Sequence, residues 1–355
     1  MDILMENRKH YIDNLRSLSI LLLFPVHTFM IWNNFGSGFY IWLKESKIYS
    51  TIIVLINPWF MPLLFLLAGI SARHSMEKRT NREFIKQRIG KLLIPFACGM
   101  FFLIPIQTLY ARKFFYNYNG GFIENLWYFF THFTDLSGYD GAFTPGHLWF
   151  ILYLFIIQSV SLVIFQLLPY KKAVQAAEKL NIYCIMLLFV PVWLMYYIGN
   201  FGGFSIGKNL ALYLAGFYII SNNAVIIKIE KNIKWITSLC VAGTLASAVL
   251  YYKFSFYGDL WINYLGWNTI LVLIVYGKRY MDKKTKLTDF ASKASYPVYI
   301  LHQSILVMFA YYAVQSCNNI IIQAAVICLG SFILTLAAYY IIKKIPLIRK
   351  IAGIK

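Results

Sequence analysis

Long apolar runs, repeated along the whole chain, are the feature that most constrains how this sequence can fold. A transmembrane helix needs about 20 mostly apolar residues to cross roughly 30 Å of hydrocarbon. Ten such runs can be traced, and they leave no long polar stretch for a separate soluble domain. The predicted spans are 17–35, 51–72, 92–110, 147–168, 182–199, 206–221, 235–253, 259–277, 296–316 and 320–342.

The supply of charge excludes a soluble protein. Of the 355 residues, 59% are hydrophobic and 13% are charged, whereas soluble domains carry about 25% charged residues. The net charge of +19 is a feature of nucleic-acid binders as well. Here, however, the charge lies in short clusters between the apolar runs, so we expect no nucleic-acid partner.

The positions of Lys and Arg predict the orientation of the spans, because these residues concentrate on the cytoplasmic side of a membrane. With a cytoplasmic N-terminus and ten spans, 27 of the 33 basic residues fall on the inner side. The sequence therefore predicts an all-α, polytopic membrane helix bundle in the plasma membrane, with about ten spans, both termini cytoplasmic and a first span that is retained rather than cleaved. The six outer basic residues are Lys44, Lys47, Arg112, Lys113, Lys208 and Lys253.

The longest outer segment, about 111–146, differs from the inner loops and interrupts what we expect to be a single domain over 1–355. It is rich in Tyr, Phe, Gly and Asn and contains Glu124, Asp135 and Asp140. Long loops often carry function, and aromatic faces with a few carboxylates suit sugar binding. An interfacial aromatic belt explains the same composition, and both interpretations stay open.

An arginine and a histidine in the first run form the clearest candidate site. Arg16 and His27 are eleven residues apart, so on a regular helix they share a face to within about 20° and lie about 16.5 Å apart along the axis. Asp13 lies one turn before Arg16 on nearly the same face. A buried histidine that only supports packing is the alternative, but ionisable residues inside lipid are costly and favour a functional role.

Two further runs carry polar residues. Ser295, Tyr299 and His302 fall at i, i+4 and i+7 on one stripe of the ninth run. His147 and Trp149 begin the fourth run at its outer end, where they would face a molecule bound by the outer loop. Hydrogen bonding between helices explains His302 as well as a functional role does, and it is favoured for Tyr299. His147 needs no explanation beyond an ordinary interfacial position.

The inner loop at 73–91 is the most basic segment of the chain. It would attract anionic membrane lipid or a soluble polyphosphate, and Arg73, Arg88 and Lys91 at the helix ends are best placed to reach a bound ligand. The cysteines show no CxxC pair or metal-like spacing, so neither a disulfide framework nor a metal site is expected. They are Cys98, Cys184, Cys240, Cys317 and Cys328.

Together, these motifs resemble the membrane acyltransferase 3 family. Arg16, ten intervening residues and His27 reproduce the arginine–histidine motif of that family. The fourth-run segment His147-Leu148-Trp149-Phe150 is similar to the signature of its glucan-modifying branch. The resemblance covers nearly the whole chain, in order. The segments that carry it are 11–16 with His27, 61–69, 88–95, 147–150 and 295–302.

The resemblance implies transfer of an acyl group, most often acetyl, from cytoplasmic acyl-coenzyme A to a hydroxyl of a cell-surface or exported carbohydrate. His27 and Arg16 would be catalytic, with His27 as a neutral general base or as the site of a covalent acyl relay. Charge-assisted hydrogen bonds suit the anionic end of the donor. The expected donor-binding residues are Arg16, Asp13, Arg73, Arg88 and Lys91, and the expected acceptor or cavity residues are His147, Trp149, Tyr299 and His302.

Two other classes compete with an acyltransferase. A transporter or exporter also places histidines and broken helices at the middle of the membrane, but the chain shows no paired half-repeats and few acidic residues within its runs. A lipid-binding or structural membrane protein explains the basic loops but not Arg16 and His27 in one run.

Overall fold

Helix accounts for 79% of the computed structural model, which describes residues 9–35, 38–201, 203–316, 318–346 and 349. The described sheet is one antiparallel pair, β1 (Asn200–Phe201) and β2 (Phe204–Ser205), with Asn200 opposite Ser205. The predicted all-α fold class is therefore confirmed. The described cysteines Cys98, Cys184, Cys240 and Cys328 are free thiols, and Cys317 lies outside the described residues.

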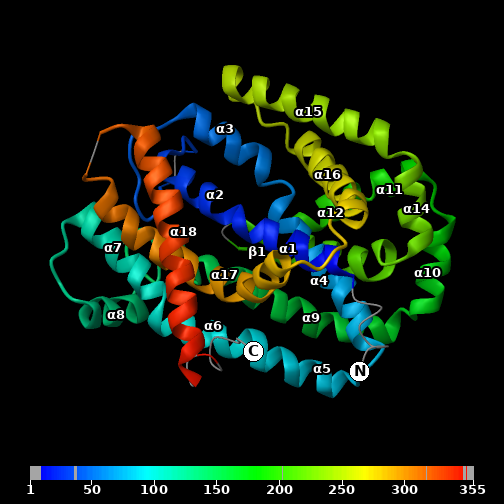
Figure 1. Ribbon diagram of the computed structural model, residues 1–355, viewed down its shortest axis with the longest axis horizontal. Helices are drawn as coiled ribbons and strands as arrows, with labels where there is room; N and C mark the ends of the chain where they lie inside the picture. Colours follow the sequence, from blue (N-terminus) through cyan, green and yellow to red (C-terminus); the bar gives the residue numbers. More distant parts are fainter. Residues whose placement is uncertain (1–8, 36–37, 202, 317, 347–348, 350–355) are drawn as a thin grey trace. The chain divides into compact units, whose positions relative to one another are not determined.

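The helices follow one another along the whole chain (Figure 1). The α-helices are α1 His10–Leu21, α2 Leu23–Phe29, α3 Lys47–Ile56, α4 Phe60–Met76, α5 Asn81–Arg88, α6 Ile94–Phe102, α7 Ile104–Tyr116, α8 Phe122–Thr131, α9 Trp149–Leu167, α10 Tyr170–Lys179, α11 Ile182–Leu187, α12 Phe189–Leu194, α13 Ile206–Ala215, α14 Asn223–Lys231, α15 Ile233–Phe254, α16 Asp259–Tyr280, α17 Lys286–Ala313 and α18 Ile320–Lys344. The shorter turns are the 3₁₀ segments η2 Met30–Trp32, η4 Gly146–Leu148 and η5 Met195–Tyr197, and the π segments η3 Ile89–Leu93 and η6 Gly216–Ile220.

By length and composition, seven helical segments within the described residues can cross a membrane, or up to nine when each of two bent pairs counts as one span. The seven contain the first four predicted spans and the seventh, eighth and tenth. The fifth and sixth predicted spans lie in the bent pairs, at Tyr170–Lys179 with Ile182–Tyr197 (116°) and Ile206–Ile220 with Asn223–Lys231 (91°). The ninth corresponds to α17, which is long enough but more polar, because it carries His302, Gln303 and several tyrosines.

Prolines explain where several helices break. Pro25 has no amide hydrogen, so the carbonyl of Leu21 loses its helical partner. Helix α1 ends at Leu21, and α2 begins at Leu23. Pro105 stands in the same way in the first turn of α7, after the break from α6 at Leu103. A proline is tolerated in a first helical turn, because the amides there have no helical partner in any case.

Polar side chains cap the first turns of helices that begin outside the apolar segments. Thr80 and Glu83 form a reciprocal capping box at the start of α5, in which the Thr80 amide donates to Glu83 Oε2 (2.9 Å) and the Glu83 amide donates to Thr80 Oγ1 (3.3 Å). Thr285 and Thr288 exchange the same two bonds before α17, at 2.9 and 3.1 Å. Such caps contribute about 1 kcal/mol each.

The chain divides into two compact units. The first unit comprises the chain up to Ser19, Leu55–Ile85 and Ile156–Lys293, and the second comprises Ile20–Val54, Lys86–Phe155 and the chain from Ala294 onward. Each of the five passages from one unit to the other falls inside a helix, namely α1, α3, α5, α9 or α17.

Two glycines set the helix packing in the first unit, where α4 lies against α13 and η6. A Cβ atom on Gly69 would lie 2.0 Å from the carbonyl oxygen of Tyr213, and one on Gly216 would lie 2.2 Å from that of Leu66. The two backbones therefore meet directly, as small residues allow between membrane helices. Helices α15 and α16 lie side by side in the same unit (Figure 1).

The second unit packs α2 against α18 and α7 against α8. Its apolar core includes Ile31, Trp32 and Ile41 from the segment around η2, together with Leu306 of α17 and Ile327 of α18. Residues far apart in the sequence therefore meet in one core.

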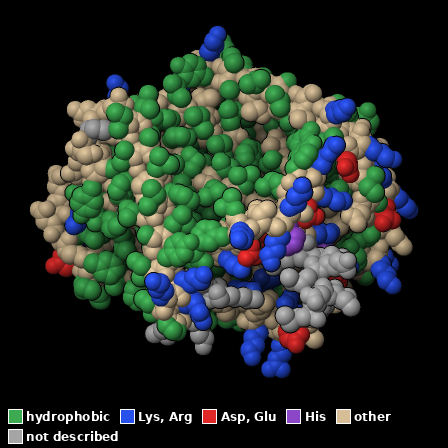
Figure 2. All heavy atoms as spheres, in the orientation of Figure 1, with side chains coloured by type: hydrophobic (Ala, Val, Ile, Leu, Met, Phe, Trp, Pro, Cys, Tyr) green, Lys and Arg blue, Asp and Glu red, His purple; other side chains and the backbone are tan. Residues whose placement is uncertain are grey.

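Large apolar side chains are also exposed. Examples are Trp127 and Ile333 in the second unit and Leu245 in the first. Hydrophobic side chains cover much of the visible face, while Lys and Arg side chains gather in groups (Figure 2). Exposed apolar surface of this extent is unfavourable in water and normal in lipid. Together with the span-length helices, it identifies a polytopic membrane protein.

Candidate active site

Arg16 lies on α1 in the first unit, where its guanidinium has two partners. Its Nη1 atom forms an ion pair with Asp13 Oδ1 at 2.9 Å, and its Nη2 atom donates to Ser71 Oγ at 3.1 Å. The Ser71 hydroxyl donates in turn to the carbonyl of Leu67 (2.8 Å), which ties it to α4. The Arg16 side chain remains 33% exposed. Because a guanidinium carries five N–H donors, an incoming anion can still be bound.

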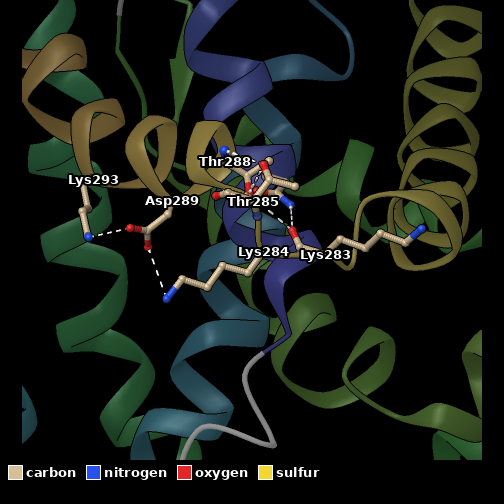
Figure 3. Close-up of polar contacts among 7 residues, drawn as sticks. Lys283, Lys284, Thr285, Thr288, Asp289 and Lys293 are labelled. Atoms are coloured by element: carbon tan, nitrogen blue, oxygen red, sulfur yellow. Dashed lines mark hydrogen bonds and ion pairs between the residues drawn. The ribbon is translucent and has the colours of Figure 1, made fainter.

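The start of α17 fixes the beginning of α1 in the same unit. Asn14 Nδ2 donates to the carbonyls of Met281 (2.6 Å) and Lys283 (3.1 Å). Asp289 forms ion pairs with Lys284 (3.7 Å) and Lys293 (2.6 Å), as Figure 3 shows beside the threonine cap.

The amine of Lys9 lies just before α1, among other charges. Burial and, second, the charge of Lys278 lower the pKa of Lys9, and the carboxylates of Asp282 and Glu77 oppose that effect. Cations brought together in this way disfavour each other's charge, and a bound anion relieves the repulsion. Lys9 and Lys278 therefore form a small basic group beside the carboxylates of Asp282 and Glu77.

Of the other predicted donor-binding residues, Arg73 lies in the first unit, whereas Arg88 and Lys91 lie in the second. Arg73 Nη2 pairs with Glu77 at 3.0 Å, and its guanidinium lies 3.4 Å from the centre of the Tyr170 ring. In the second unit the Tyr296 hydroxyl donates to the carbonyl of Lys91. Arg16 and His27 likewise fall in different units on the span His10–Trp32, with the Pro25 break between them, so their shared face stays a prediction.

Three histidines meet in the second unit. They come from α2 (His27), η4 (His147) and α17 (His302). The ring centres of His27 and His302 are 5.3 Å apart, and those of His147 and His302 are 5.0 Å apart. His302 is fully buried, and His147 is only 5% exposed. The sequence predicted an interfacial position for His147, but the turn at Pro145–Gly146 carries it into the interior, with Gly146 at a φ of 49°.

The hydrogen bonds of His147 fix its tautomer. Its Nε2 atom lies 2.9 Å from the carbonyl of Ile300, which can only accept, so Nε2 carries the hydrogen. Its Nδ1 atom then accepts a bond from Gln107 Nε2 at 3.0 Å. Gln107 also donates to Ser304 Oγ (2.9 Å) and accepts from Gln303 Nε2 (3.1 Å). Both ring nitrogens of His147 are therefore occupied by protein partners.

Sequence reasoning did not single out Gln107, although a signal was present. A primary amide inside the apolar run 92–110 is costly in lipid unless it is hydrogen-bonded. In the structure Gln107 is fully buried and joins α7 to α17 and η4. Ser304, which donates to the carbonyl of Leu103 at 2.9 Å, closes the same network.

His302 has one bonded and one unbonded nitrogen. Its Nδ1 atom donates to the carbonyl of Tyr299 at 2.6 Å, while the hydroxyl of Tyr299 donates to the carbonyl of His147. The Nε2 atom of His302 is buried and has no hydrogen-bond partner among the described residues. An unsatisfied buried polar group of this kind costs about 1–3 kcal/mol, and such groups in native proteins call for an explanation.

His27 has the same kind of vacancy in its hydrogen bonding. Its Nδ1 atom is buried without a partner in the described part of the chain, although the residue as a whole is partly exposed. Its ring stacks on Phe39, with centres 5.9 Å apart and planes 11° apart. A base needs an available nitrogen and an accessible ring, and His27 has both.

Two loops bring aromatic residues to this unit. Phe39 and Tyr40 are buried, and Tyr139 of the predicted outer loop meets Tyr40 edge to face at 5.2 Å. Burial, and second the charge of Asp135, raise the pKa of Tyr139 to about 12, so this phenol stays neutral at physiological pH. Trp149 contacts Tyr153 (5.4 Å), and its neighbour Phe150 contacts Tyr299 (5.5 Å).

No group of three or more His, Cys, Asp or Glu side chains in the described residues is arranged to hold a metal ion. The clustered imidazoles instead bond to backbone carbonyls and an amide, or keep a free nitrogen.

The fold and this site define a polytopic helical membrane protein with three clustered histidines in its second unit. The chain matches a family described as an acyltransferase domain over residues 9–341, and it therefore belongs to the acyltransferase 3 family. The resemblance drawn from the motifs is confirmed. No curated relative and no solved structure gives a significant match.

Proposed function

We propose that this membrane acyltransferase moves an acyl group, acetyl in the first instance, from acyl-coenzyme A to a hydroxyl of a cell-surface or exported carbohydrate. The observation that carries the proposal is His27. It is a partly exposed imidazole in a membrane span, with a buried nitrogen that no described residue satisfies. Ionisable groups at such positions mark function.

The donor fits the first unit. Coenzyme A carries phosphates at its nucleotide end, and guanidinium groups bind phosphate through paired, charge-assisted hydrogen bonds. Arg16 is held by Asp13 and Ser71 and remains partly exposed, while Arg73 is stacked on Tyr170. The cluster that contains Lys9 adds positive charge in the same unit. Arg88 and Lys91 belong to the second unit, and their part in donor binding stays a prediction from the sequence.

The reaction needs one base. A neutral His27 takes the proton of the acceptor hydroxyl while the oxygen attacks the thioester carbon. The carbon–sulfur bond then breaks, and the leaving thiolate takes the proton from the imidazolium. A positioned base of this kind contributes about 10²–10⁴-fold to the rate. Arg16 acts on the donor by binding its anionic end.

The acceptor fits the outer side. Under the topology predicted from the basic residues, with cytoplasmic termini and a plasma-membrane location, segment 111–146 faces outward. Its aromatic residues lie in the same unit as His147, Trp149, Tyr299 and His302, which we propose line the acceptor site. Sugars stack on aromatic rings and donate hydroxyls to polar groups.

Purified protein in lipid nanodiscs provides the test. With acetyl-coenzyme A and a candidate polysaccharide, the wild type should release free coenzyme A and yield an ester on the glycan. His27→Ala should reduce turnover by about 10²–10⁴-fold while inserting normally. The control is Tyr183→Ala, because Tyr183 is an exposed ring in the first unit and belongs to neither proposed binding site. Full turnover by His27→Ala would show that the base is assigned incorrectly.

One observation favours a transporter as the second candidate. The bends of 116° and 91° in the first unit resemble the broken helices that form transport pathways. A transporter would move a glycan across proteoliposomes without consuming acyl-coenzyme A. Transport combined with the absence of acyl-coenzyme A binding would replace the proposed transfer reaction.

A further inference from the structure

The three clustered histidines differ in one respect that the proposed reaction leaves unexplained. His147 uses both ring nitrogens, whereas His27 Nδ1 and His302 Nε2 are each buried with no hydrogen-bond partner in the described chain. The rings that carry these two free nitrogens are neighbours, with centres 5.3 Å apart. Because the two unsatisfied nitrogens lie on neighbouring rings, each is a candidate partner for the other.

The chemistry of His302 decides which partner it can take. Because its Nδ1 hydrogen is given to the carbonyl of Tyr299 at 2.6 Å, the neutral ring has its lone pair on Nε2. This nitrogen therefore accepts a hydrogen bond. Besides His27, the rings packed against His302 are those of Phe24, Tyr299 and His147. Tyr299 already donates its hydroxyl to a carbonyl, and His147 donates its own hydrogen to Ile300.

We infer that His302 is a positioning residue for His27, and that its Nε2 atom accepts the Nδ1 hydrogen of His27 during the reaction. This inference rests on the proposed function. An N–H···N bond of about 2.9–3.0 Å between two imidazoles in line places their centres about 5 Å apart. The observed separation of 5.3 Å is close to that value. The His302 ring stays bonded to the Tyr299 carbonyl, and rotation of the His27 ring about its Cβ–Cγ bond brings its Nδ1 atom towards His302 Nε2.

The bond gives His27 a defined tautomer. With hydrogen on Nδ1, its lone pair is on Nε2, which takes the proton of the acceptor hydroxyl as the new carbon–oxygen bond forms. The imidazolium then donates from Nδ1 to His302 and from Nε2 to the leaving thiolate, which keeps that proton. His302 gains and loses no proton in the cycle. A base that is itself oriented by a third group is the general pattern of such sites.

His147 and Gln107 hold this arrangement in place. The ring of His147 meets His302 edge to face, with planes 84° apart, and its own tautomer is fixed by Gln107 and Ile300. Both ring nitrogens of His147 are therefore engaged, and this ring offers no hydrogen-bond partner to His302.

The experiment measures kcat, KM for acetyl-coenzyme A and the pH–rate profile of the full-length protein in nanodiscs. His302→Ala should lower kcat by about tenfold to a hundredfold, as loss of correct positioning does, with KM for the donor unchanged. It should also move the acid limb of the kcat profile to lower pH, because the imidazolium of His27 loses an acceptor. His302→Gln, whose amide oxygen can accept, should recover most of the rate. Tyr183→Ala, at an exposed ring of the first unit, serves as the control.

Each outcome is decisive. An unchanged kcat in His302→Ala, or a lower kcat with the acid limb in its wild-type position, overturns the inference. If His302→Ala is not recovered folded, His302→Gln decides: activity within tenfold of wild type supports the inference, and any larger loss in the folded variant overturns it. The proposed function fails separately, if the wild type releases no coenzyme A or if His27→Ala is fully active.

Discussion

Arg16 and Arg73 of the first unit are each paired with a carboxylate. By contrast, His27 and His302 of the second unit each have one buried ring nitrogen with no hydrogen-bond partner among the described residues. A partly exposed ion pair exchanges readily for a ligand, since it is worth about 0–1 kcal/mol. A buried nitrogen without a partner has lost its hydrogen bonds to water, which costs about 1–3 kcal/mol. The comparison teaches that the residues proposed to bind the donor are already paired, whereas the proposed base and its neighbour are not fully hydrogen-bonded.

The largest effect after removal of His27 should come from Arg16. Arg16→Met should raise KM for acetyl-coenzyme A about tenfold to a hundredfold, because a charge-assisted bond to phosphate contributes about 1.5–3 kcal/mol. Steady-state release of coenzyme A measures this, and Arg16→Lys should recover only part of the loss, since lysine lacks the planar fork. A fall in kcat with KM unchanged would move Arg16 from donor binding to the chemical step.

Disruption of the hydrogen-bond network of the second unit should lower the thermal stability of the protein. Gln107→Leu leaves the His147 Nδ1 atom and the Gln303 amide without their partner. We expect a loss of about 1–3 kcal/mol for each group left unsatisfied. Thermal unfolding in detergent measures the loss. Gln158→Leu provides a comparison, because the oxygen of that buried amide already lacks a partner. Equal losses in the two variants would contradict the role given to the network.

The smallest effect should come from the partner of Arg16. Asp13→Asn removes a carboxylate that competes with the incoming anion, so KM for acetyl-coenzyme A should fall by up to about fivefold, in line with the small worth of an exposed pair. Measurements at low and high salt sharpen the result, because salt screens the competing charge. An increase in KM would mean that Asp13 holds Arg16 in its binding position.

The sequence predicts the helical bundle and the charged pair Arg16 and Asp13 much better than it predicts the hydrogen-bond network around Gln107. Runs of apolar residues predict helices, because every backbone group in lipid needs an internal hydrogen-bond partner. The predicted helical bundle is confirmed by the structure. The bends at 116° and 91° were not foreseen, because hydropathy carries no information about direction. Arg16 and His27 were identified because ionisable residues at the end of an apolar run, or inside it, are rare.

The surroundings of His302 show why the rest of the site was out of reach. Its stripe with Tyr299 was visible as a helical period, but the arrival of His147 depends on the path of a loop. Gln107 meets Gln303 across 196 positions of sequence, and no local pattern joins two such residues. Tautomers follow only from distances to particular carbonyls.

The direct meeting of α4 with α13 and η6 has a consequence for genetics. Gly69 and Gly216 each face a carbonyl oxygen that leaves no room for one methyl group, so even alanine, the mildest replacement, forces two helices apart. A saturation screen for inactive variants will return both glycines alongside His27. They will score as essential while touching neither donor nor acceptor, and protein abundance rather than turnover will tell the two kinds of loss apart.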